Sequence, residues 1–381
     1  MGAERGRQGT CRGLLDELRA TRLCVHVGAY RHNIAMLKAA CAPAALMAVV
    51  KANAYGHGLV PMARAAIEAG AQWVGVAMAE EGVLLRRAQC DAPILVLGLV
   101  NAKGAQACVQ RGLTMTVSDA TCIEWAQHAA EQAGTAAYVH LKLDTGMGRI
   151  GARTPAQVVE CMSALRRSPK VQLSGVYTHL ADADNADPTY TDAQLARFAF
   201  LRGVLPDGLI THAAASAAAL ARSETQFDMV RIGIASYGYA PVPTEIPLQP
   251  CLSWAAEVAF VKDLAPGDSV SYGCTFTADR PMRVATLAVG YGDGYPRALS
   301  GRGRVLLHGR SCSILGRVCM DQMMVDVTHV PQTKPGDSAT LLGRDGEEAI
   351  DANELACLLD TIPYEVLMLP KQRVPVIYDE E

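Results

Sequence analysis

The chain has 381 residues, half of them hydrophobic, with a formal net charge of −3 and a sequence pI near 6.3. This length is enough for two domains or one large barrel with a second unit, and the slightly acidic charge argues against nucleic-acid binding. Twelve scattered cysteines without a C-x-x-C pair are typical of reduced thiols in a cytoplasmic protein, and no apolar run is long enough to predict a transmembrane helix.

The N-terminal segment "MGAERGRQGTCRG" is charged and glycine-rich, and it lacks the apolar stretch of a signal peptide. We therefore expect residues 1–20 to be an extension outside the folded domains. A cytoplasmic location follows as an expectation from this segment and from the cysteine usage.

From Ala45 onwards, short apolar runs alternate with stretches of helical periodicity. The helix signals include Thr154 as a cap before Pro155, and Gly70 and Gly134 as stops. Eight near-continuous apolar runs predict parallel strands that are covered on both faces, and the count favours a (β/α)8 TIM-type barrel over residues 21–245, with a doubly wound sheet as the alternative. The predicted strands are 45–51, 73–78, 93–100, 113–119, 136–144, 173–180, 209–214 and 229–234.

The pattern changes after residue 240, where "PVPTEIPLQP" has four prolines in ten residues and indicates a linker. Short β-like runs then follow, separated by turn signals such as "PGD" and "RDGEE". Residues 246–381 are therefore predicted to form a mostly antiparallel β-domain, and the first strand, 21–28, belongs either to the barrel or to this domain.

Chemically active side chains follow successive predicted barrel strands. In a barrel, catalytic groups lie at the carboxyl ends of the strands, so we expect these side chains to share one rim. Each has an ordinary interpretation by itself, as a surface lysine, a structural histidine or a helix cap, and their common placement is what indicates a site. They are Lys51 in "AVVKANAYGHG", Arg149, His179, Ser216 and Arg231.

A lysine beside a phosphate site predicts pyridoxal 5′-phosphate (PLP) held by a Schiff base. The Ser216 hydroxyl with the Gly233 and Ile234 amides could bind the phosphate without a metal ion. The "GMGRIG" segment at 146–151 matches a dinucleotide fingerprint, but the next helix is predicted only from Thr154, and Val171 stands where that fingerprint needs an acid. A nicotinamide cofactor is therefore not favoured.

From about Thr21 to Tyr378 the chain resembles fold-type III PLP-dependent alanine racemases. The resemblance implies a PLP-bearing barrel followed by a β-domain, which agrees with the prediction from periodicity. It is carried by nine ordered segments: "AVVKANAYGHG", "LKLDTGMGRIG", "VYTHLADAD", "HAAASAAAL", "FDMVRIGIASYG", "VSYGCTF", "VGYGDGYPR", "GRVCMDQMMVD" and "TIPYEV".

The resemblance also implies roles for individual residues. Lys51 would hold PLP and act as one base, and Tyr272 of the partner subunit would be the second base on the opposite face of the substrate. Arg231 would face the pyridine nitrogen with His179 supporting it. The phosphate contacts would be Tyr55, Ser216, Gly233, Ile234 and Tyr364.

For the substrate, the resemblance implies that Arg149 and the Met320 backbone hold the carboxylate. Lys142 can be carbamylated in such enzymes and then orients Arg149, while Tyr291 and Asp321 lie near the substrate entrance. The implied activity is the interconversion of L- and D-alanine by a homodimeric isomerase, which supplies D-alanine for peptidoglycan precursors. Neither a metal ion, a nucleic acid nor a membrane is expected as a partner.

Three departures from the family pattern are visible: Ala215 replaces the usual Asn before Ser216, the first strand reads "RLCVHV", and residues 1–20 have no counterpart. The alternatives are a serine or broad-specificity racemase, a fold-type III decarboxylase and a non-catalytic PLP carrier. Tyr364 and Tyr291 favour a substrate little larger than alanine. The "VSYG" and "CMDQ" segments argue against a decarboxylase, and a carrier would need no second base.

Overall fold

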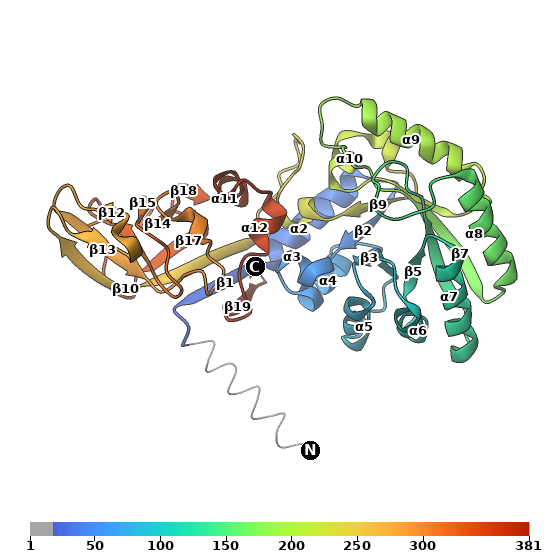
Figure 1. Ribbon diagram of the computed structural model, residues 1–381, viewed down its shortest axis with the longest axis horizontal. Helices are drawn as coiled ribbons and strands as arrows, with labels where there is room; N and C mark the ends of the chain where they lie inside the picture. Colours follow the sequence, from blue (N-terminus) through green and yellow to red (C-terminus); the bar gives the residue numbers. More distant parts are fainter. Residues whose placement is uncertain (1–17, 381) are drawn as a thin grey trace, which may run out of the picture. The chain divides into compact units, whose positions relative to one another are not determined.

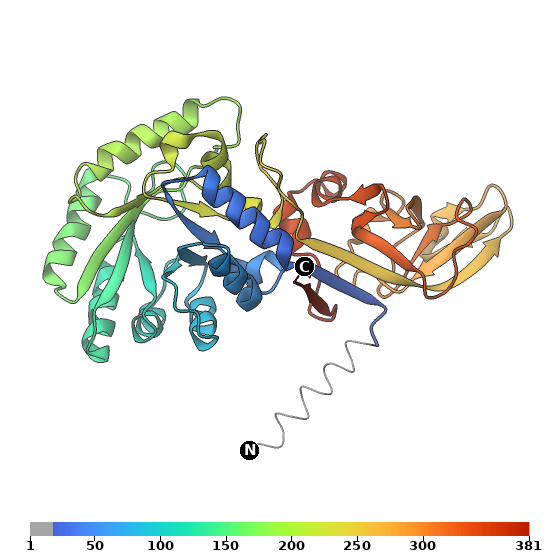
Figure 2. The ribbon, with the colours of Figure 1, turned by 180° about the vertical axis from the view of Figure 1, so that it is seen from behind.

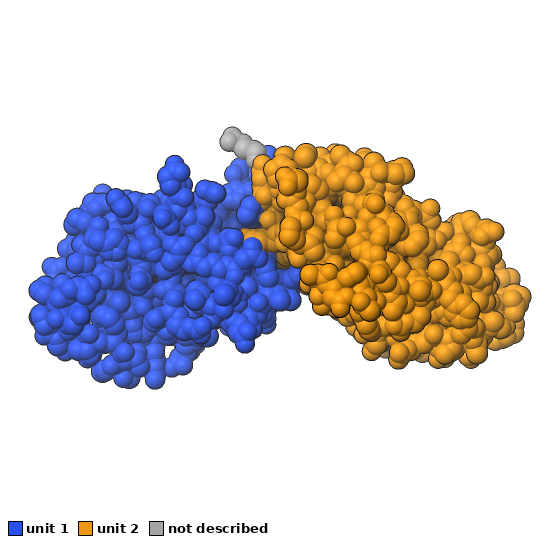
Figure 3. All heavy atoms as spheres, turned by 90° about the horizontal axis from the view of Figure 1, so that it is seen from above, with its two compact units in different colours: residues 1–28, 250–381 blue, residues 29–249 orange. Residues whose placement is uncertain are grey.

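The computed structural model describes residues 18–380, which divide into two compact units with boundaries after Gly28 and Gln249 (Figure 3). We call residues 29–249 the barrel unit, and the remaining described residues the β unit. Most of the predicted extension at residues 1–20 lies outside the described residues.

The barrel unit contains eight parallel strands in one sheet with the order β8-β7-β6-β5-β4-β3-β2-β9 (Figure 1). Hydrogen bonds from Arg231 N–H to Ala214 O (3.0 Å) and from Asp228 N–H to Thr211 O (3.1 Å) link β9 to the β8 segment and bring the sheet close to closure. The strand order never reverses, so the predicted TIM-type barrel is confirmed and the doubly wound alternative is wrong. The strands are β2 (Ala45–Val49), β3 (Trp73–Val76), β4 (Ile94–Val96), β5 (Thr114–Val117), β6 (Ala137–Lys142), β7 (Val171–Tyr177), β8 (Ile210–His212) and β9 (Met229–Ile232).

Helices alternate with these strands and cover the outside of the sheet, as the two opposite views show (Figures 1 and 2). The predicted cap at Thr154 is present, because Thr154 and Gln157 form a capping box before Pro155. Asp119 caps another helix by accepting a hydrogen bond from Cys122 N–H (2.9 Å). The helices are α2 (Val27–Ala40), α3 (Lys51–Tyr55), α4 (Leu59–Glu68), α5 (Ala79–Arg87), α6 (Ala102–Gln110), α7 (Ala120–Ala133), α8 (Pro155–Arg167), α9 (Thr189–Arg202) and α10 (Ser216–Ala221), with the 3-10 turns η1 (Ser223–Thr225) and η2 (Ile234–Tyr237).

The β unit is built on a nine-stranded sheet with the order β18-β17-β14-β15-β16-β13-β10-β1-β19. Its pairings are antiparallel except for β1 with β19. Its elements are β1 (Thr21–His26), β10 (Leu252–Leu264), β11 (Ser269–Val270), η3 (Tyr272–Cys274), β12 (Phe276–Thr277), β13 (Met282–Leu287), η4 (Arg297–Leu299), β14 (Arg304–Leu307), β15 (Arg310–Leu315), β16 (Met323–Asp326), β17 (Ser338–Asp345), β18 (Glu348–Ile350), α11 (Ala352–Leu359), α12 (Pro363–Leu367) and β19 (Val376–Asp379).

Each unit has an apolar core of its own. Met47 of β2, Leu95 of β4 and Met229 of β9 form one cluster inside the barrel unit, and Val284 and Leu315 belong to a cluster in the β unit. Every helix within residues 18–380 is too short or too polar to span a lipid bilayer. The apolar runs in the sequence are therefore explained by these cores.

Candidate active site

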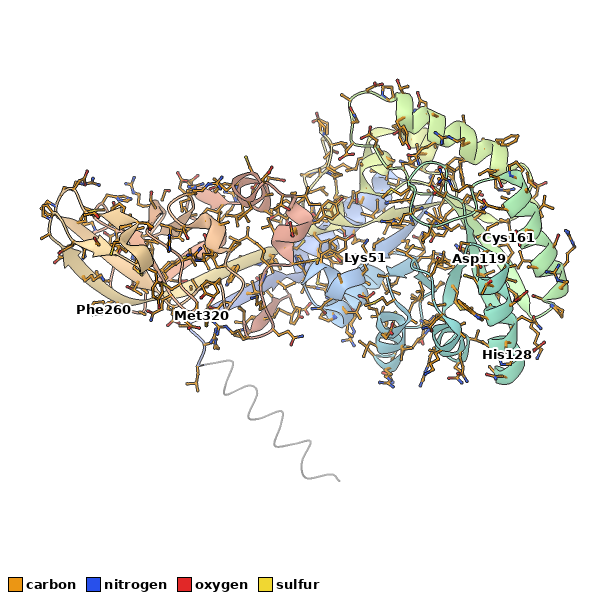
Figure 4. The ribbon with its side chains drawn as sticks, in the orientation of Figure 1. Lys51, Asp119, His128, Cys161, Phe260 and Met320 are labelled. Atoms are coloured by element: carbon orange, nitrogen blue, oxygen red, sulfur yellow. The ribbon has the colours of Figure 1, made fainter. Side chains whose placement is uncertain are left out.

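Lys51 follows β2 and begins a left-handed turn (Figure 4). The four residues after it, Ala52 to Tyr55, have φ values of 53°, 54°, 53° and 53°. Left-handed helical backbone costs about 1–2 kcal/mol per residue other than glycine, so this turn must be held by its surroundings.

Long-range hydrogen bonds supply that support. The Glu81 carboxylate accepts from Ala52 N–H (2.6 Å) and from Ala77 N–H (2.8 Å). Asn53 Oδ1 accepts from Leu59 N–H (2.9 Å) at the start of α4. The turn therefore fixes the direction in which the chain leaves Lys51.

A second anchor of the turn is the buried imidazole of His57. Its Nδ1 lies 3.1 Å from Ala54 O and 3.0 Å from Tyr55 O, so this nitrogen carries the proton and donates. Burial lowers the pKa of His57 to about 4, and the ring is neutral at physiological pH.

Lys51 is half-buried in a cationic environment. Its pKa is lowered first by burial and then by the neighbouring Arg149, with Arg231 adding a smaller effect, while Glu81 acts in the opposite direction. The lysine is thus shifted toward the neutral amine, the form that reacts with a carbonyl group or accepts a proton.

Four of the predicted phosphate contacts belong to the barrel unit. Buried Ser216 accepts a hydrogen bond from Gly233 N–H (3.1 Å), directly before η2 and its first residue, Ile234. A Cβ at position 233 would lie 2.5 Å from the Tyr55 hydroxyl oxygen, so the close approach of Tyr55 requires glycine there. The Ser216 hydroxyl, the Tyr55 phenol and the backbone amides at the start of η2 are groups that can bind an anion.

Arg231 is 4% exposed and has several acceptors around its guanidinium. It donates to Thr178 O (2.9 Å), to Ala213 O (2.8 Å) and to the ring nitrogens of two histidines, His179 Nδ1 (3.2 Å) and His212 Nδ1 (3.0 Å). Burial lowers the pKa of Arg231 to about 10, which leaves it a cation at neutral pH in one fixed orientation.

The hydrogen bonds of Arg231 continue through two buried histidines. Because His212 Nδ1 accepts from Arg231, the proton of His212 is on Nε2, which lies 2.9 Å from His140 Nδ1. The His212 ring also stacks on Tyr177 at 4.6 Å between ring centroids. Burial lowers the pKa of His140 to about 3 and that of His212 well below its usual value, so both rings are neutral.

Lys142 ends β6 in a fully buried position, with its Nζ 4.1 Å from the centre of the Tyr177 ring. Burial lowers its pKa far below the ordinary value, and the charges of Arg231 and Arg149 add to this effect. Arg149, by contrast, is exposed in the loop after β6.

The "GMGRIG" loop at 146–151 is organised by Asp144, whose Oδ1 accepts from Gly146 N–H and Gly148 N–H, both at 3.0 Å. The next helix, α8, begins only at Pro155. The structural context of a dinucleotide fingerprint is therefore missing at this loop.

The other predicted site residues belong to the β unit. Tyr272 is 71% exposed on a turn where Ser271 and Cys274 have φ values of 66° and 46°. Ser271 Oγ donates to Arg317 O (2.6 Å), which ties this turn to the loop before β16. An open pocket of about 500 Å³ is lined by Ser271, Tyr272, Cys319, Met320, Asp321 and Gln322.

Arg373 orders the predicted substrate-side residues of the β unit. It donates to Asp321 Oδ1 (2.8 Å) and forms an ion pair with buried Asp293 (2.8 Å). The Met320 carbonyl accepts from Gly292 N–H (2.8 Å), next to Tyr291. Tyr364 lies in the first turn of α12.

The predicted residues are thus divided between the two units. The barrel unit holds Lys51, Tyr55, Lys142, Arg149, His179, Ser216, Arg231, Gly233 and Ile234, and the β unit holds Tyr272, Tyr291, Met320, Asp321 and Tyr364. Sequence reasoning missed Glu81, His212 and Arg373. His212 had a signal, because Thr211-His212 repeats the Thr178-His179 pair at the end of another barrel strand.

Comparisons with known proteins cover both units. Residues 25–241 match the family model described as alanine racemase, N-terminal domain, and residues 251–378 match the model described as alanine racemase, C-terminal domain. An alanine racemase of Symbiobacterium thermophilum is 48% identical over 374 residues, which covers 96% of this chain and 99% of the relative.

Solved structures of racemases are also similar to this chain. The alanine racemase from Bacillus anthracis with bound L-Ala-P has a TM-score of 0.89 and 36% identity, covering 95% of this chain and 96% of that chain. A histidine racemase from Leuconostoc mesenteroides has a TM-score of 0.88 and 31% identity, covering 95% and 98%.

Proposed function

Because this chain belongs to the alanine racemase family of PLP-dependent isomerases, we propose that it interconverts L- and D-alanine with Lys51 and Tyr272 of the partner subunit as its two bases. The observation that carries this proposal is the convergence of a lysine, an anion cradle and a buried arginine at the carboxyl ends of parallel strands in the barrel unit. Delivery of D-alanine to peptidoglycan precursors is the proposed role of the product.

The residues of the barrel unit fit PLP. Ser216, Gly233, Ile234 and Tyr55 would hold the phosphate, and Lys51 would carry the covalent link. Tyr364 of the β unit is proposed as a further phosphate contact. When bound, the cofactor supplies an electron-withdrawing ring that acidifies the Cα–H bond of an attached amino acid.

Racemisation requires a proton to leave one face of Cα and another to arrive on the opposite face. Lys51 is suited to one face because burial and Arg149 shift it toward the neutral amine. Tyr272 is proposed for the other face, because it is an exposed phenol at the rim of the β-unit pocket. Each base would remove the proton from one enantiomer, and the protonated form of the opposite base would deliver a proton to the other face of Cα.

Arg231 would limit side reactions. Its hydrogen bonds to His179, His212 and two carbonyl groups leave a fixed cation that we place beside the pyridine nitrogen. A cation at that position keeps the nitrogen unprotonated, which makes the ring a weaker acceptor of electrons. His179 and His212 act through Arg231, as positioning residues.

Arg149 and the backbone of Met320 are proposed to hold the substrate carboxylate, with Tyr291 and Asp321 near the entrance. Lys142 is proposed to be carbamylated, because a buried neutral amine near Arg231 and Arg149 can react with CO₂, releasing a proton and forming an anion that pairs with these cations. Carbon-13 NMR of enzyme equilibrated with ¹³C-bicarbonate should show a carbamate signal that is absent from Lys142→Met.

A homodimer would complete each site. Tyr272 and Met320 expose 71% and 53% of their surfaces on the β unit, which suits a surface that a second polypeptide covers. A chain without a partner would then have Lys51 but no facing tyrosine.

Mixing two inactive variants tests the shared site. Heterodimers of Lys51→Ala and Tyr272→Phe chains would hold one site with both defects and one with both native bases, so activity should return to roughly a quarter of wild type after full exchange. The control is each variant exchanged with itself, which should stay inactive. If mass spectrometry shows heterodimers and no activity returns, the shared-site proposal is wrong.

A broader substrate range is the second candidate, and the similarity to a histidine racemase supports testing it. Racemisation of a panel of amino acids with added PLP separates the two. Tyr291 and Tyr364 lead us to expect alanine as the best substrate, with serine next and histidine slowest. A faster rate with histidine than with alanine would reverse this assignment.

A further inference from the structure

Three metal-ligating side chains gather on one face of the β-unit sheet, and none of them has a role in the proposed reaction. Cys24 and His26 are two residues apart on β1 and so point to the same face, and Asp379 stands opposite His26 on the parallel strand β19. Cys24 Sγ lies 3.9 Å from His26 Nδ1, and Asp379 Oδ2 lies 3.4 Å from the same nitrogen.

These distances can be compared with a tetrahedral zinc site. Bonds of about 2.0–2.3 Å from zinc to nitrogen, oxygen and sulfur place neighbouring ligand atoms about 3.3–3.6 Å apart. The three ligand atoms all lie within 4.8 Å of one another, and the two measured distances differ from the ideal range by a few tenths of an ångström at most. Small side-chain rotations would therefore complete the geometry.

The other ring nitrogen of His26 has a partner of its own. His26 Nε2 lies 3.0 Å from Ser253 Oγ, and Ser253 stands opposite Cys24 on β10. With Nε2–H donating to this hydroxyl, the lone pair of Nδ1 points toward Cys24 and Asp379. Metal-bound histidines are usually oriented by such a hydrogen bond from their second nitrogen.

Strand β17 passes close to Ser253. A Cβ at Gly343 of β17 would lie 2.8 Å from the Ser253 Cβ, so the two strands approach each other closely at this point. The ligands are also reachable from solvent, because the His26 and Asp379 side chains are 36% and 44% exposed.

We propose that Cys24, His26 and Asp379 bind one divalent transition-metal ion of the zinc type, with water completing a tetrahedral shell. A cysteine, a histidine and a carboxylate select such an ion over calcium or magnesium, which take oxygen ligands. Cys24 releases its thiol proton to solvent on binding. Within residues 18–380, β19 lies at the edge of the sheet and pairs with β1 alone, so the ion would fasten this strand to its neighbour.

Cobalt(II) is the probe for this site, because it follows zinc in its ligand preference and is coloured. Chelator-treated holoenzyme titrated with Co²⁺ should bind one equivalent per chain, with ligand-field bands of a tetrahedral ion and a thiolate-to-cobalt charge-transfer band. Cys24→Ser should lose the charge-transfer band, and His26→Gln and Asp379→Asn should weaken binding by about 10-fold or more. The matched control is Cys357→Ser, an exposed cysteine of the same unit, which should leave binding unchanged.

Hydrogen exchange gives a second measurement. Zinc should slow amide exchange in β19 of the wild type and of Cys357→Ser, without slowing it in Cys24→Ser. Racemase activity should be the same in all of these variants, so a failure of the metal site is distinguishable from a failure of the proposed reaction. The proposal is overturned if one equivalent of Co²⁺ gives no thiolate band, or if Cys24→Ser and the wild type bind alike.

Discussion

In the barrel unit Arg231 is 4% exposed and its guanidinium is surrounded by carbonyl groups and histidines, whereas in the β unit Tyr272 is 71% exposed on a surface turn. The barrel residues are oriented within one chain by hydrogen bonds from several strands. Among the described residues of the β unit, no comparable set of hydrogen bonds surrounds Tyr272. The difference fits the proposal that a single chain holds the cofactor and that a partner subunit encloses the second base.

Backbone strain is common to both halves. Ala52 to Tyr55 follow the barrel lysine in left-handed conformation, and Ser271 and Cys274 flank the β-unit tyrosine with positive φ values. In both places the strained residues are next to a proposed base. Strain of this kind persists only where surrounding contacts enforce it, and it fixes the direction of the neighbouring side chain.

The largest expected effect comes from removing the lysine of the barrel half. Lys51→Ala should lower racemase activity by at least about 10^4-fold, because it removes both a proposed base and the proposed covalent anchor of the cofactor. Borohydride reduction of the wild type followed by peptide mass spectrometry should place the cofactor label on Lys51. Recovery of the label on Lys142 would contradict the assignment.

Removing the Tyr272 phenol of the β unit should have a smaller effect, which should differ between the two enantiomers of alanine. Tyr272→Phe should retain bound cofactor, because Lys51 is intact, and should lose about 10^2- to 10^4-fold in activity. Solvent-deuterium exchange at Cα should fall more for L-alanine than for D-alanine. Tyr378→Phe, at another exposed tyrosine of the β unit, is the matched control and should leave both exchange rates unchanged. Equal mild losses for both enantiomers in Tyr272→Phe would remove Tyr272 from the mechanism.

The two halves also differ in how far sequence alone could describe them. Parallel barrel strands are buried on both faces, so apolar runs in the sequence predicted all eight of them. Lys51 and Ser216 could be predicted as site residues because they follow the ends of such runs. The left-handed turn had no such signal, because "ANAY" has ordinary helical propensities and its hand is imposed by Glu81, 29 residues after Ala52 in the chain. The hydrogen-bonded chain from Arg231 through His212 to His140 joins three separate strands, which no local pattern encodes.

Acid should destabilise the barrel unit before the β unit. Above pH 6.5 a buried histidine is neutral in both states. Below that pH the imidazole becomes protonated in the unfolded chain but stays neutral in the native protein. The free energy of unfolding therefore drops by about 1.4 kcal/mol per pH unit for each such histidine. The loss continues to about pH 4 for His57 and about pH 3 for His140.

Hydrogen exchange measured from pH 7 to pH 5 checks this expectation. Barrel peptides should lose protection first, since the described histidines of the β unit are exposed or half-exposed. In His57→Gln the barrel unit should take up one proton fewer on unfolding in acid, so its free energy of unfolding should depend less steeply on pH. Parallel loss of protection in both units, with no change in His57→Gln, would show that these histidines do not govern acid stability.

Relieving the strain in the turn after Lys51 should change the free energy of unfolding by about 1 kcal/mol. Ala52→Gly should raise the free energy of unfolding by roughly that amount, because glycine adopts positive φ without the steric cost of a Cβ. Activity should fall slightly, since a freer turn orients Lys51 less well. Ala65→Gly, in the right-handed helix α4, is the control and should destabilise the unit. A loss of stability in both variants would mean that the turn is not strained.

The smallest effect concerns one helix start in each unit. In the β unit Asp351 caps α11 by accepting from Glu354 N–H (2.8 Å), whereas in the barrel unit Ala215 precedes α10 with extended backbone angles and no side chain that can cap it. Asn is among the best capping residues, and exchanging such a cap for Ala costs about 0.5–2 kcal/mol. Ala215→Asn should therefore stabilise the barrel unit by about as much as Asp351→Ala destabilises the β unit, with Ala217→Asn inside α10 as the control. Urea denaturation of the cofactor-free protein measures both changes. If Ala215→Asn raises cofactor affinity without changing stability, the amide acts on the neighbouring cradle at Ser216 and not as a helix cap.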